Sequence, residues 1–193
     1  MIDQILTDLS KRFSIPEEAL SYIKSISKYK KFSPREHLLH QGGKTSTLYI
    51  VMTGLIRSYS ITDDKEWTSS FFKEGEVAGD LQGVILDKSA ERSLMALEET
   101  TCFCVPYDSL KGKYEKESWL GQSVGEYMKH EYSQRARLKM DLLSLKPEDR
   151  YHYLGEHLPW LFERVSDRYI ACYMGVTPVS YSRIKNRQGS FRH

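Results

Sequence analysis

The sequence predicts an α+β protein in which a β-roll, a long helix and a C-terminal helix-turn-helix follow one another. Three observations indicate this order. Short β-type segments separated by turn residues fill residues 36–105, a stretch without proline and almost without glycine covers 119–145, and two helical patterns meet at Gly175. The expected domains are a jelly-roll domain at 1–117, a long helix at 118–145 and a helix-turn-helix domain at 146–193.

Residues 3–12 and 16–30 are expected to be helices. In the second, Pro16 stands in the first turn, where it removes no helical hydrogen bond, and two glutamates follow it at the N-terminal end. Its apolar residues recur at helical spacing at positions 19, 20, 23 and 26. The cations from Lys28 to Lys31 are then the solvated end of this helix, or else a small basic patch.

From Phe32 the pattern changes to short strands separated by glycine-rich or aspartate-rich turns. At least six strands are expected, at 36–40, 48–53, 55–62, 66–72, 92–97 and 101–105. No helical pattern between them is long enough for a crossover between parallel strands. An antiparallel barrel or a double-sheet jelly roll is therefore predicted.

Two helices are expected after Pro106, at 107–116 and 119–145. The second would be about 40 Å long. Its incomplete apolar seam consists of Val124, Met128, Leu138, Leu142 and Leu145. A helix of that length has too little barrel to pack against, so we expect it to pair with a second copy of itself, although polar residues at 131, 134 and 135 interrupt the seam.

Residues 167–187 predict two short helices that cross at a sharp turn. Gly175 stands where the first helix must end in a left-handed conformation, Thr177 can cap the second helix, and Pro178 suits its first turn. The residues that then face outward are Ser180, Arg183, Lys185 and Arg187. Between 179 and 188 there are three cations and no acid, whereas a solvated helix usually mixes signs. This favours DNA binding over a packing hairpin with a basic face.

Composition supports a globular protein that binds a polyanion. Of 193 residues 40% are hydrophobic, and no apolar run approaches the roughly 20 residues of a membrane span. The first 13 residues are charged and amphipathic, unlike a signal peptide, so we expect a cytoplasmic protein without a membrane partner. The formal net charge of +2 conceals an asymmetry, because residues 150–193 carry +4 and residues 1–149 carry −2. Positive charge is thus concentrated around the helix-turn-helix.

The cysteines and histidines do not predict a metal site or a disulfide framework. Cys102 and Cys104 share a strand face without further ligands nearby, and Cys172 is remote in sequence. A metal enzyme of the cupin kind would need histidines clustered on neighbouring strands. His37 and His40 cannot share a face if both lie on one regular strand, because their separation is odd. We therefore expect no enzyme and no metal.

The arrangement resembles the Crp/Fnr family of bacterial transcription regulators over roughly residues 5–190. The matching stretches are His40-Gln41-Gly42, Leu48-Tyr49-Ile50-Val51, Thr53-Gly54-Leu55-Ile56-Arg57, Phe72-Lys73-Glu74-Gly75-Glu76, Ala96-Leu97-Glu98, Ile170-Ala171 and Arg183-Ile184. Pro147-Glu148-Asp149-Arg150-Tyr151 is similar to the branch of the family that is abundant in Bacteroidetes.

The resemblance implies a homodimer formed through the long helix, and a winged helix-turn-helix that reads palindromic double-stranded DNA. RNA polymerase is a further partner that it implies. Arg183 matches an arginine that contacts guanine, while Pro178 and Val179 stand at two other base-reading positions and imply a different operator. Thr177 and Ser180 are expected to contact phosphate, and Lys185 and Arg187 to add affinity that does not depend on sequence.

The resemblance also implies a cyclic-nucleotide-binding-like effector site, but its pattern is altered here. Cyclic nucleotide binders carry Gly-Glu where this chain has Gly79-Asp80, and their Arg-Ser pair corresponds to Arg92-Ser93 only after a shift of two residues. A shift of two preserves the strand face. A cyclic nucleotide, another small effector and no cofactor at all remain open. So does a ligand-binding module without a DNA function.

Overall fold

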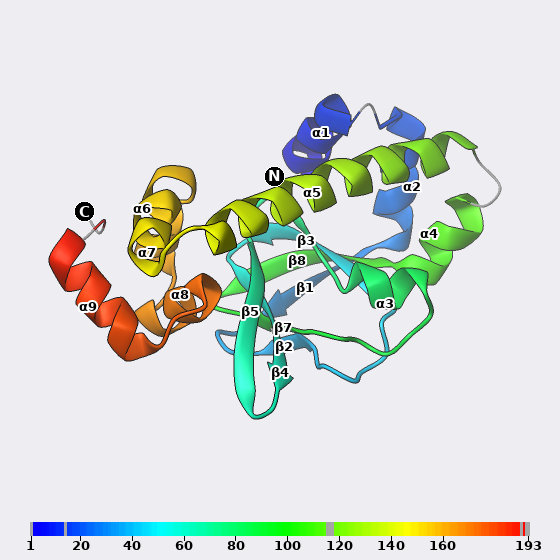
Figure 1. The fold of residues 1–193 in the computed structure, drawn as a ribbon. Helices are drawn as coiled ribbons and strands as arrows, with labels where there is room; N and C mark the ends of the chain where they lie inside the picture. The colour runs from blue at the N-terminus through cyan, green and yellow to red at the C-terminus, as the bar shows by residue number, and fades with distance from the viewer. Residues whose placement is uncertain (1, 14, 115–117, 190, 192–193) are drawn as a thin grey trace. The chain divides into compact units, whose positions relative to one another are not determined.

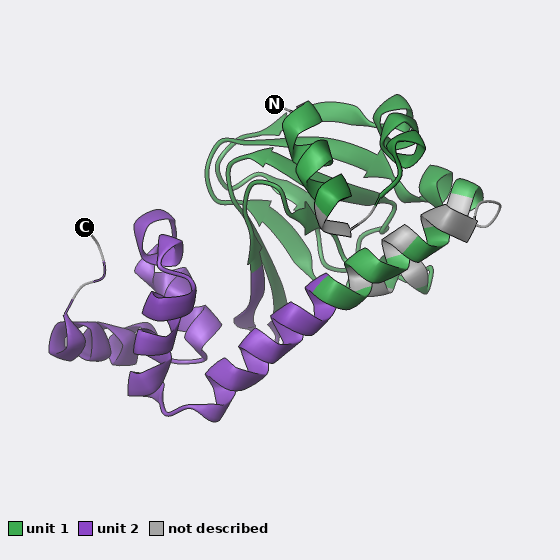
Figure 2. Cartoon of the chain, turned by 90° about the horizontal axis from the view of Figure 1, so that it is seen from above, with its two compact units in different colours: residues 1–60, 71–130 green, residues 61–70, 131–193 purple. Residues whose placement is uncertain are grey.

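The computed structural model describes residues 2–13, 15–114, 118–189 and 191 (Figure 1). Its internal contacts divide the chain into two compact units (Figure 2). Unit 1 comprises residues 1–60 and 71–130, and unit 2 comprises residues 61–70 and 131–193. The tip of one hairpin therefore groups with the C-terminal helices.

The β-roll consists of two antiparallel four-stranded sheets with strand orders β1-β8-β3-β6 and β2-β7-β4-β5. The strands are β1 (Lys28–Phe32), β2 (His37–Leu39), β3 (Thr47–Thr53), β4 (Ile56–Thr62), β5 (Lys65–Phe72), β6 (Val77–Ala78), β7 (Ser93–Ala96) and β8 (Thr100–Pro106). In the first sheet β3 pairs with β8 from Thr47↔Pro106 onward. In the second, β4 pairs with β7 from Ile56↔Ala96 to Tyr59↔Ser93. The predicted double-sheet jelly roll is confirmed.

Strand alternation places apolar side chains in two cores of unit 1. Val51 belongs to one cluster together with Ile56 and Leu94, whereas its neighbours Ile50 and Met52 belong to another. Helices cover this second cluster, namely α1 (Ile2–Phe13), α2 (Glu17–Ile26) and α4 (Tyr107–Tyr114). Both faces of β3 are thereby buried.

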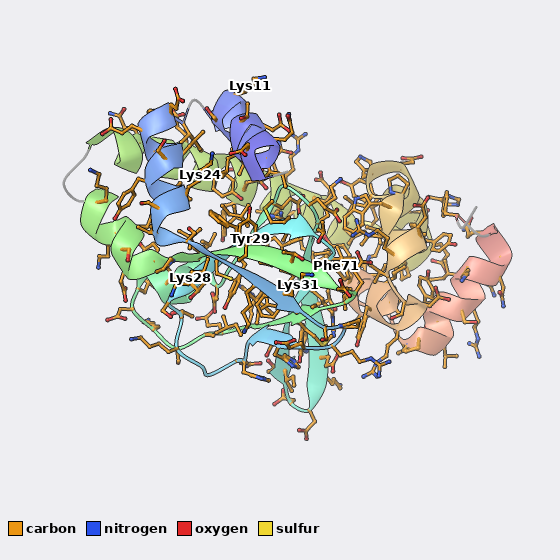
Figure 3. All side chains as sticks on the ribbon, turned by 180° about the vertical axis from the view of Figure 1, so that it is seen from behind. Lys11, Lys24, Lys28, Tyr29, Lys31 and Phe71 are labelled. Carbon is orange, nitrogen blue, oxygen red and sulfur yellow. The ribbon has the colours of Figure 1, made fainter. Side chains whose placement is uncertain are left out.

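The helix expected at 16–30 ends early, because residues 28–32 form the edge strand β1. Lys28 pairs with Cys104 and Phe32 with Thr100, and the Tyr29 ring lies 5.1 Å from that of Phe103. The cations expected at a helix end therefore project from an exposed strand edge (Figure 3). Pairing with β8, distant in sequence, overrides the local helical pattern. The short elements β6 and α3 (Leu81–Ile85) were not predicted either.

The predicted long helix is confirmed as α5 (Ser118–Ser144). Its first part, to residue 130, belongs to unit 1, where the Tyr127 hydroxyl accepts a hydrogen bond of 3.2 Å from the Val77 N–H. The remainder belongs to unit 2. No helix among the described residues is long and apolar enough to cross a membrane.

Unit 2 surrounds an aromatic core. Its C-terminal helices are α6 (Pro147–His157), α7 (Trp160–Arg164), α8 (Asp167–Met174) and α9 (Pro178–Gln188). The Tyr151 ring lies 5.2 Å from Phe162, 5.9 Å from Tyr181 and 5.2 Å from Phe191. Gly155 leaves the space for Phe191, whose ring atoms would lie 2.5 Å from a Cβ at position 155. In the described part of 146–193 every regular element is a helix, so no strands of the expected wing occur there.

We predict that Gly54→Ala lowers the free energy of unfolding by about 2–4 kcal/mol, because a Cβ there is both strained and overpacked. Gly54 has φ +94°, and its Cβ would lie 2.4 Å from Thr100 Oγ1 and 2.6 Å from the Glu99 carbonyl oxygen. Gly42→Ala is the control, because φ is +82° but nothing lies within 4 Å. It should cost about 1 kcal/mol. Urea unfolding measures both, and equal losses would contradict the steric explanation.

Candidate nucleic-acid interface and effector site

The turn between α8 and α9 is a Schellman motif. Gly175 adopts φ +70°, its N–H donates to the Cys172 carbonyl at 3.1 Å, and the Val176 N–H donates to the Ala171 carbonyl at 3.0 Å. This is the left-handed turn that the sequence predicted. Ile170, Ala171, Tyr181 and Ile184 are buried and Val176 is half-buried, so the expected inward face of the helix pair is also confirmed.

Two cations satisfy the last carbonyl groups of α8. Lys139 Nζ donates to the Tyr173 carbonyl at 2.8 Å, and an Arg150 Nη donates to the Met174 carbonyl at 2.7 Å. Arg150 also binds the Leu143 and Leu145 carbonyls, at 3.1 and 3.0 Å. Positive charge at a helix C-terminus complements the helix dipole. The end of α8 is therefore fixed by side chains of α5 and α6.

Lys139 is partly buried, with its ammonium 4.1 Å from the centre of the Tyr173 ring. The pKa of Lys139 is lowered to about 8, mainly because burial desolvates the ammonium; Cys172 opposes this shift and the nearby Arg150 adds to it. Lys139 therefore loses its proton much more readily than an exposed lysine.

The start of α9 is capped as predicted. Thr177 Oγ1 accepts a hydrogen bond of 3.1 Å from the Ser180 N–H and donates one of 2.9 Å to Ser180 Oγ, and Pro178 is the first helical residue. Both hydroxyl groups that were expected to contact phosphate thus also build the cap. Thr177 is exposed and Ser180 is half-buried.

The exposed face of α9 carries the remaining predicted DNA-binding residues. Arg183 and Arg187 are exposed, whereas Lys185 is half-buried and its Nζ forms an ion pair of 2.8 Å with Asp167 of α8. Lys185 therefore projects less freely than expected.

Sequence reasoning missed two further residues of this face, Ser182 and Asn186, which are exposed. Val179, which the resemblance placed at a base-reading position, is 62% exposed. Together with Arg183 they follow i, i+3, i+4, i+7 spacing and form one stripe, which we call the reading stripe. The signal in the sequence is this helical spacing, which a criterion based on positive charge does not detect.

The four predicted effector residues meet at one corner of the β-roll, at the starts of α3 and β7. Asp80 is buried, and its carboxylate accepts from the Glu91 N–H at 2.6 Å and from the Gly83 N–H at 3.4 Å. An Arg92 Nη lies 4.0 Å from an Asp80 oxygen, and this arginine is about two-fifths exposed. Asp80 therefore acts as a cap that holds the loop before β7 against α3.

Ser93 and Gly79 also serve the loop structure at this corner. Ser93 Oγ accepts from the Gln41 N–H at 2.9 Å, and a Cβ at Gly79 would lie 2.7 Å from Leu48 Cδ2. Each oxygen of the buried Asp80 carboxylate already accepts an amide hydrogen bond, which a ribose hydroxyl would have to share or displace. The Arg92 guanidinium is the predicted group with most exposure here, and it is suited to an anion.

The residues of the predicted dimer seam differ in exposure. Leu142 is fully buried and Leu138 is half-buried, whereas the side chains of Val124 and Met128 lie outside the described residues. The apolar surface that this part of α5 exposes consists of Tyr132 (72%), Met140 (73%) and Leu143 (48%).

The cysteines and histidines of the β-roll pack without forming a metal cluster. Burial raises the pKa of the Cys102 thiol to about 12, so it stays protonated. The rings of His37 and His40 stack at 4.2 Å, because β2 ends at Leu39 and the regular alternation stops there. Among the described residues no group of three or more histidine, cysteine or acidic side chains is placed to hold a metal ion.

Comparison with known proteins gives a family match for the β-roll. Residues 29–117 match the family model described as cyclic nucleotide-binding domain. The chain also resembles CLP of Xanthomonas campestris, a c-di-GMP-responsive global regulator, at 18% identity and a TM-score of 0.73, over 89% of this chain and 91% of that one. Curated protein sequences give no match.

Two further solved structures share the fold. FixK2 of Bradyrhizobium japonicum is 21% identical with a TM-score of 0.65, over 84% of both chains. A transcriptional regulator of the Crp/Fnr family from Eubacterium rectale is 15% identical with a TM-score of 0.72, over 90% of this chain and 83% of that one. The expected resemblance to the Crp/Fnr family is confirmed in the fold, and the Bacteroidetes branch stays a prediction.

We predict that Lys139 makes the stability of the protein depend on pH. Its pKa is about 8 when folded against an ordinary 10.5, so between these values the unfolded chain binds more protons and the free energy of unfolding rises with pH. Below pH 8 Lys139 stays protonated in the folded chain, and its buried charge lowers the free energy of unfolding by the full amount. From pH 7 to pH 9.5 this contribution should be about 2 kcal/mol.

The variant Lys139→Met removes this titration. In urea unfolding at both pH values, the wild-type chain should gain about 2 kcal/mol more than Lys139→Met on going to pH 9.5. Lys129→Met, at an exposed position of the same helix, is the matched control. Parallel pH profiles for wild type and Lys139→Met would contradict the assignment.

Proposed function

We propose that this chain is a DNA-binding transcription regulator of the Crp/Fnr type. The reading stripe of α9 carries the proposal, because it is exposed, free of acidic residues and fixed in orientation by the turn at Gly175. The fold shared with regulators over most of both chains supports the same function. We further propose a cytoplasmic protein that contacts RNA polymerase at promoters.

In this proposal α9 enters the major groove. The Arg183 guanidinium is suited to bidentate contact with guanine, and the Asn186 amide is suited to adenine. Arg187 and the partly restrained Lys185 contribute phosphate contacts, as do the hydroxyls of Thr177 and Ser180. Val179 offers an apolar contact to a thymine methyl group.

The chain is proposed to act as a homodimer that reads a palindrome. Tyr132, Met140 and Leu143 leave an apolar strip on α5, and a second copy of the helix would cover it. Leu142 is already packed within unit 2, so we assign the seam in this region to these exposed residues, with Leu138 at its edge.

A small effector in the β-roll is proposed to control DNA binding. The family match supports a nucleotide-like ligand, and Arg92 would face its phosphate. The same match favours a second candidate, a ligand-binding module whose helix pair serves assembly only. The two candidates differ in whether the chain prefers a promoter sequence.

Fluorescence anisotropy on the purified chain separates these candidates. The probes are its own promoter region and a scrambled duplex, each with and without cyclic AMP, over a series of salt concentrations. Preference for the promoter with a steep salt dependence supports the regulator. Binding of cyclic AMP, measured separately by calorimetry, without any preference between duplexes supports the ligand module.

Arg183→Ala should weaken binding to the promoter by roughly tenfold or more, because one bidentate base contact contributes about 1–3 kcal/mol. Binding to the scrambled duplex should change little. Arg137→Ala is the control, since it removes the same charge from an exposed position on α5. Equal losses on both duplexes would assign Arg183 to phosphate contact instead of base reading.

Met140→Glu should convert the dimer to a monomer, because it places a charge in the centre of the apolar strip. Sedimentation equilibrium measures the mass. Gln134→Glu introduces the same charge at an exposed polar position of α5 that lies away from the strip, and it should leave the dimer intact. A wild-type chain that sediments as a monomer would contradict the proposed assembly.

A further inference from the structure

The outer edge of the β4–β5 hairpin is bound by two side chains of unit 2. Strand β5 is the last strand of its sheet, and residues 66 and 68 direct their backbone groups to the same open edge. The Thr68 N–H donates to Cys172 Sγ at 3.1 Å, and the Cys172 thiol donates to the Glu66 carbonyl at 3.0 Å. Lys139 Nζ donates to the Thr68 carbonyl at 3.4 Å.

The thiol thus makes the two hydrogen bonds that the backbone of a neighbouring strand would make, because it accepts one and donates the other. We call this set the hairpin clasp: the side chains of Cys172 and Lys139 with the backbone of Glu66 and Thr68. Buried backbone groups need hydrogen-bond partners, and the clasp supplies them to the Thr68 N–H and to the Glu66 and Thr68 carbonyls at this edge.

Lys139 connects the clasp to the end of α8. The same ammonium binds Thr68 of the hairpin and the Tyr173 carbonyl, one residue after Cys172. The Schellman turn and the buried Tyr181 and Ile184 then hold α9 on α8. An exposed Arg168–Glu66 pair at 3.8 Å adds little, since exposed ion pairs contribute little to stability.

We propose that Cys172 and Lys139 are positioning residues that hold the helix pair α8–α9 on the hairpin, and so set the orientation in which the reading stripe meets DNA. This inference rests on the proposed DNA-binding function. Neither residue lies on the reading stripe, so neither needs to contact DNA. A helix pair that is already oriented loses less conformational freedom on binding a specific site.

Cys172→Ala and Cys172→Ser together test the clasp. Alanine removes both hydrogen bonds, whereas the serine hydroxyl can donate and accept in their place. Cys172→Ala should bind the promoter about tenfold more weakly, which corresponds to the loss of two ordinary hydrogen bonds, with little change on the scrambled duplex. Cys172→Ser should stay within about twofold of wild type on both duplexes.

Cys104→Ala is the matched control, because it removes another partly buried thiol from β8 in unit 1. It should leave the preference for the promoter unchanged. Amide hydrogen exchange gives a readout independent of DNA, because the Thr68 N–H should exchange faster in Cys172→Ala than in wild type or Cys172→Ser.

Two results overturn the clasp. One is a promoter preference in Cys172→Ala equal to that of wild type, and the other is an equal loss in the alanine and serine variants, which would indicate packing of the sulfur. If circular dichroism shows Cys172→Ala unfolded, Lys139→Met carries the same test. A wild-type chain without promoter preference would overturn the proposed function, and the Thr68 exchange rate would then decide the clasp alone.

Discussion

The left-handed turn at Gly175 is the constraint on which the C-terminal half depends. The turn changes the direction of the chain and is closed by two backbone hydrogen bonds. It thereby determines which residues of α9 face outward. Lys139 and Arg150 fix the end of α8 immediately before this turn, and the Thr177 cap fixes the start of α9 immediately after it. The basic surface of α9 therefore gains a defined orientation from the turn and from the side chains that fix its two ends.

Sequence reasoning found this turn because every signal for it is local. Gly175 allows the left-handed conformation, Thr177 caps the next helix, and Pro178 suits its first turn. The jelly roll was accessible for a similar reason, since alternation and turn residues mark short strands. Strand β1 could not be predicted in this way, because its lysines are compatible with a helix end and its pairing with β8 joins residues 68 to 76 positions apart. The ion pair between Lys185 and Asp167 escaped prediction because it is tertiary as well.

At the effector corner, the sequence predicted which residues come together but not what their side chains bind. Asp80 and Arg92 were expected to lie close together, and they do. Their chemistry toward a ligand did not follow from the sequence, because the backbone donors of Glu91 and Gly83 that occupy Asp80 become visible only in the fold. The family match identifies the domain, whereas these hydrogen bonds show which acceptor sites of Asp80 are already in use.

The residue types at positions 155 and 191 constrain each other, although 36 positions separate them. The hydrogen of glycine is what allows the Phe191 ring to join Tyr151 and Phe162 in the core. A larger residue at 155 requires a smaller one at 191, and a lost ring at 191 leaves a void beside Gly155. Among homologous chains the two positions should accordingly covary, so that the residue at 155 reports whether the end of the chain closes the helical core.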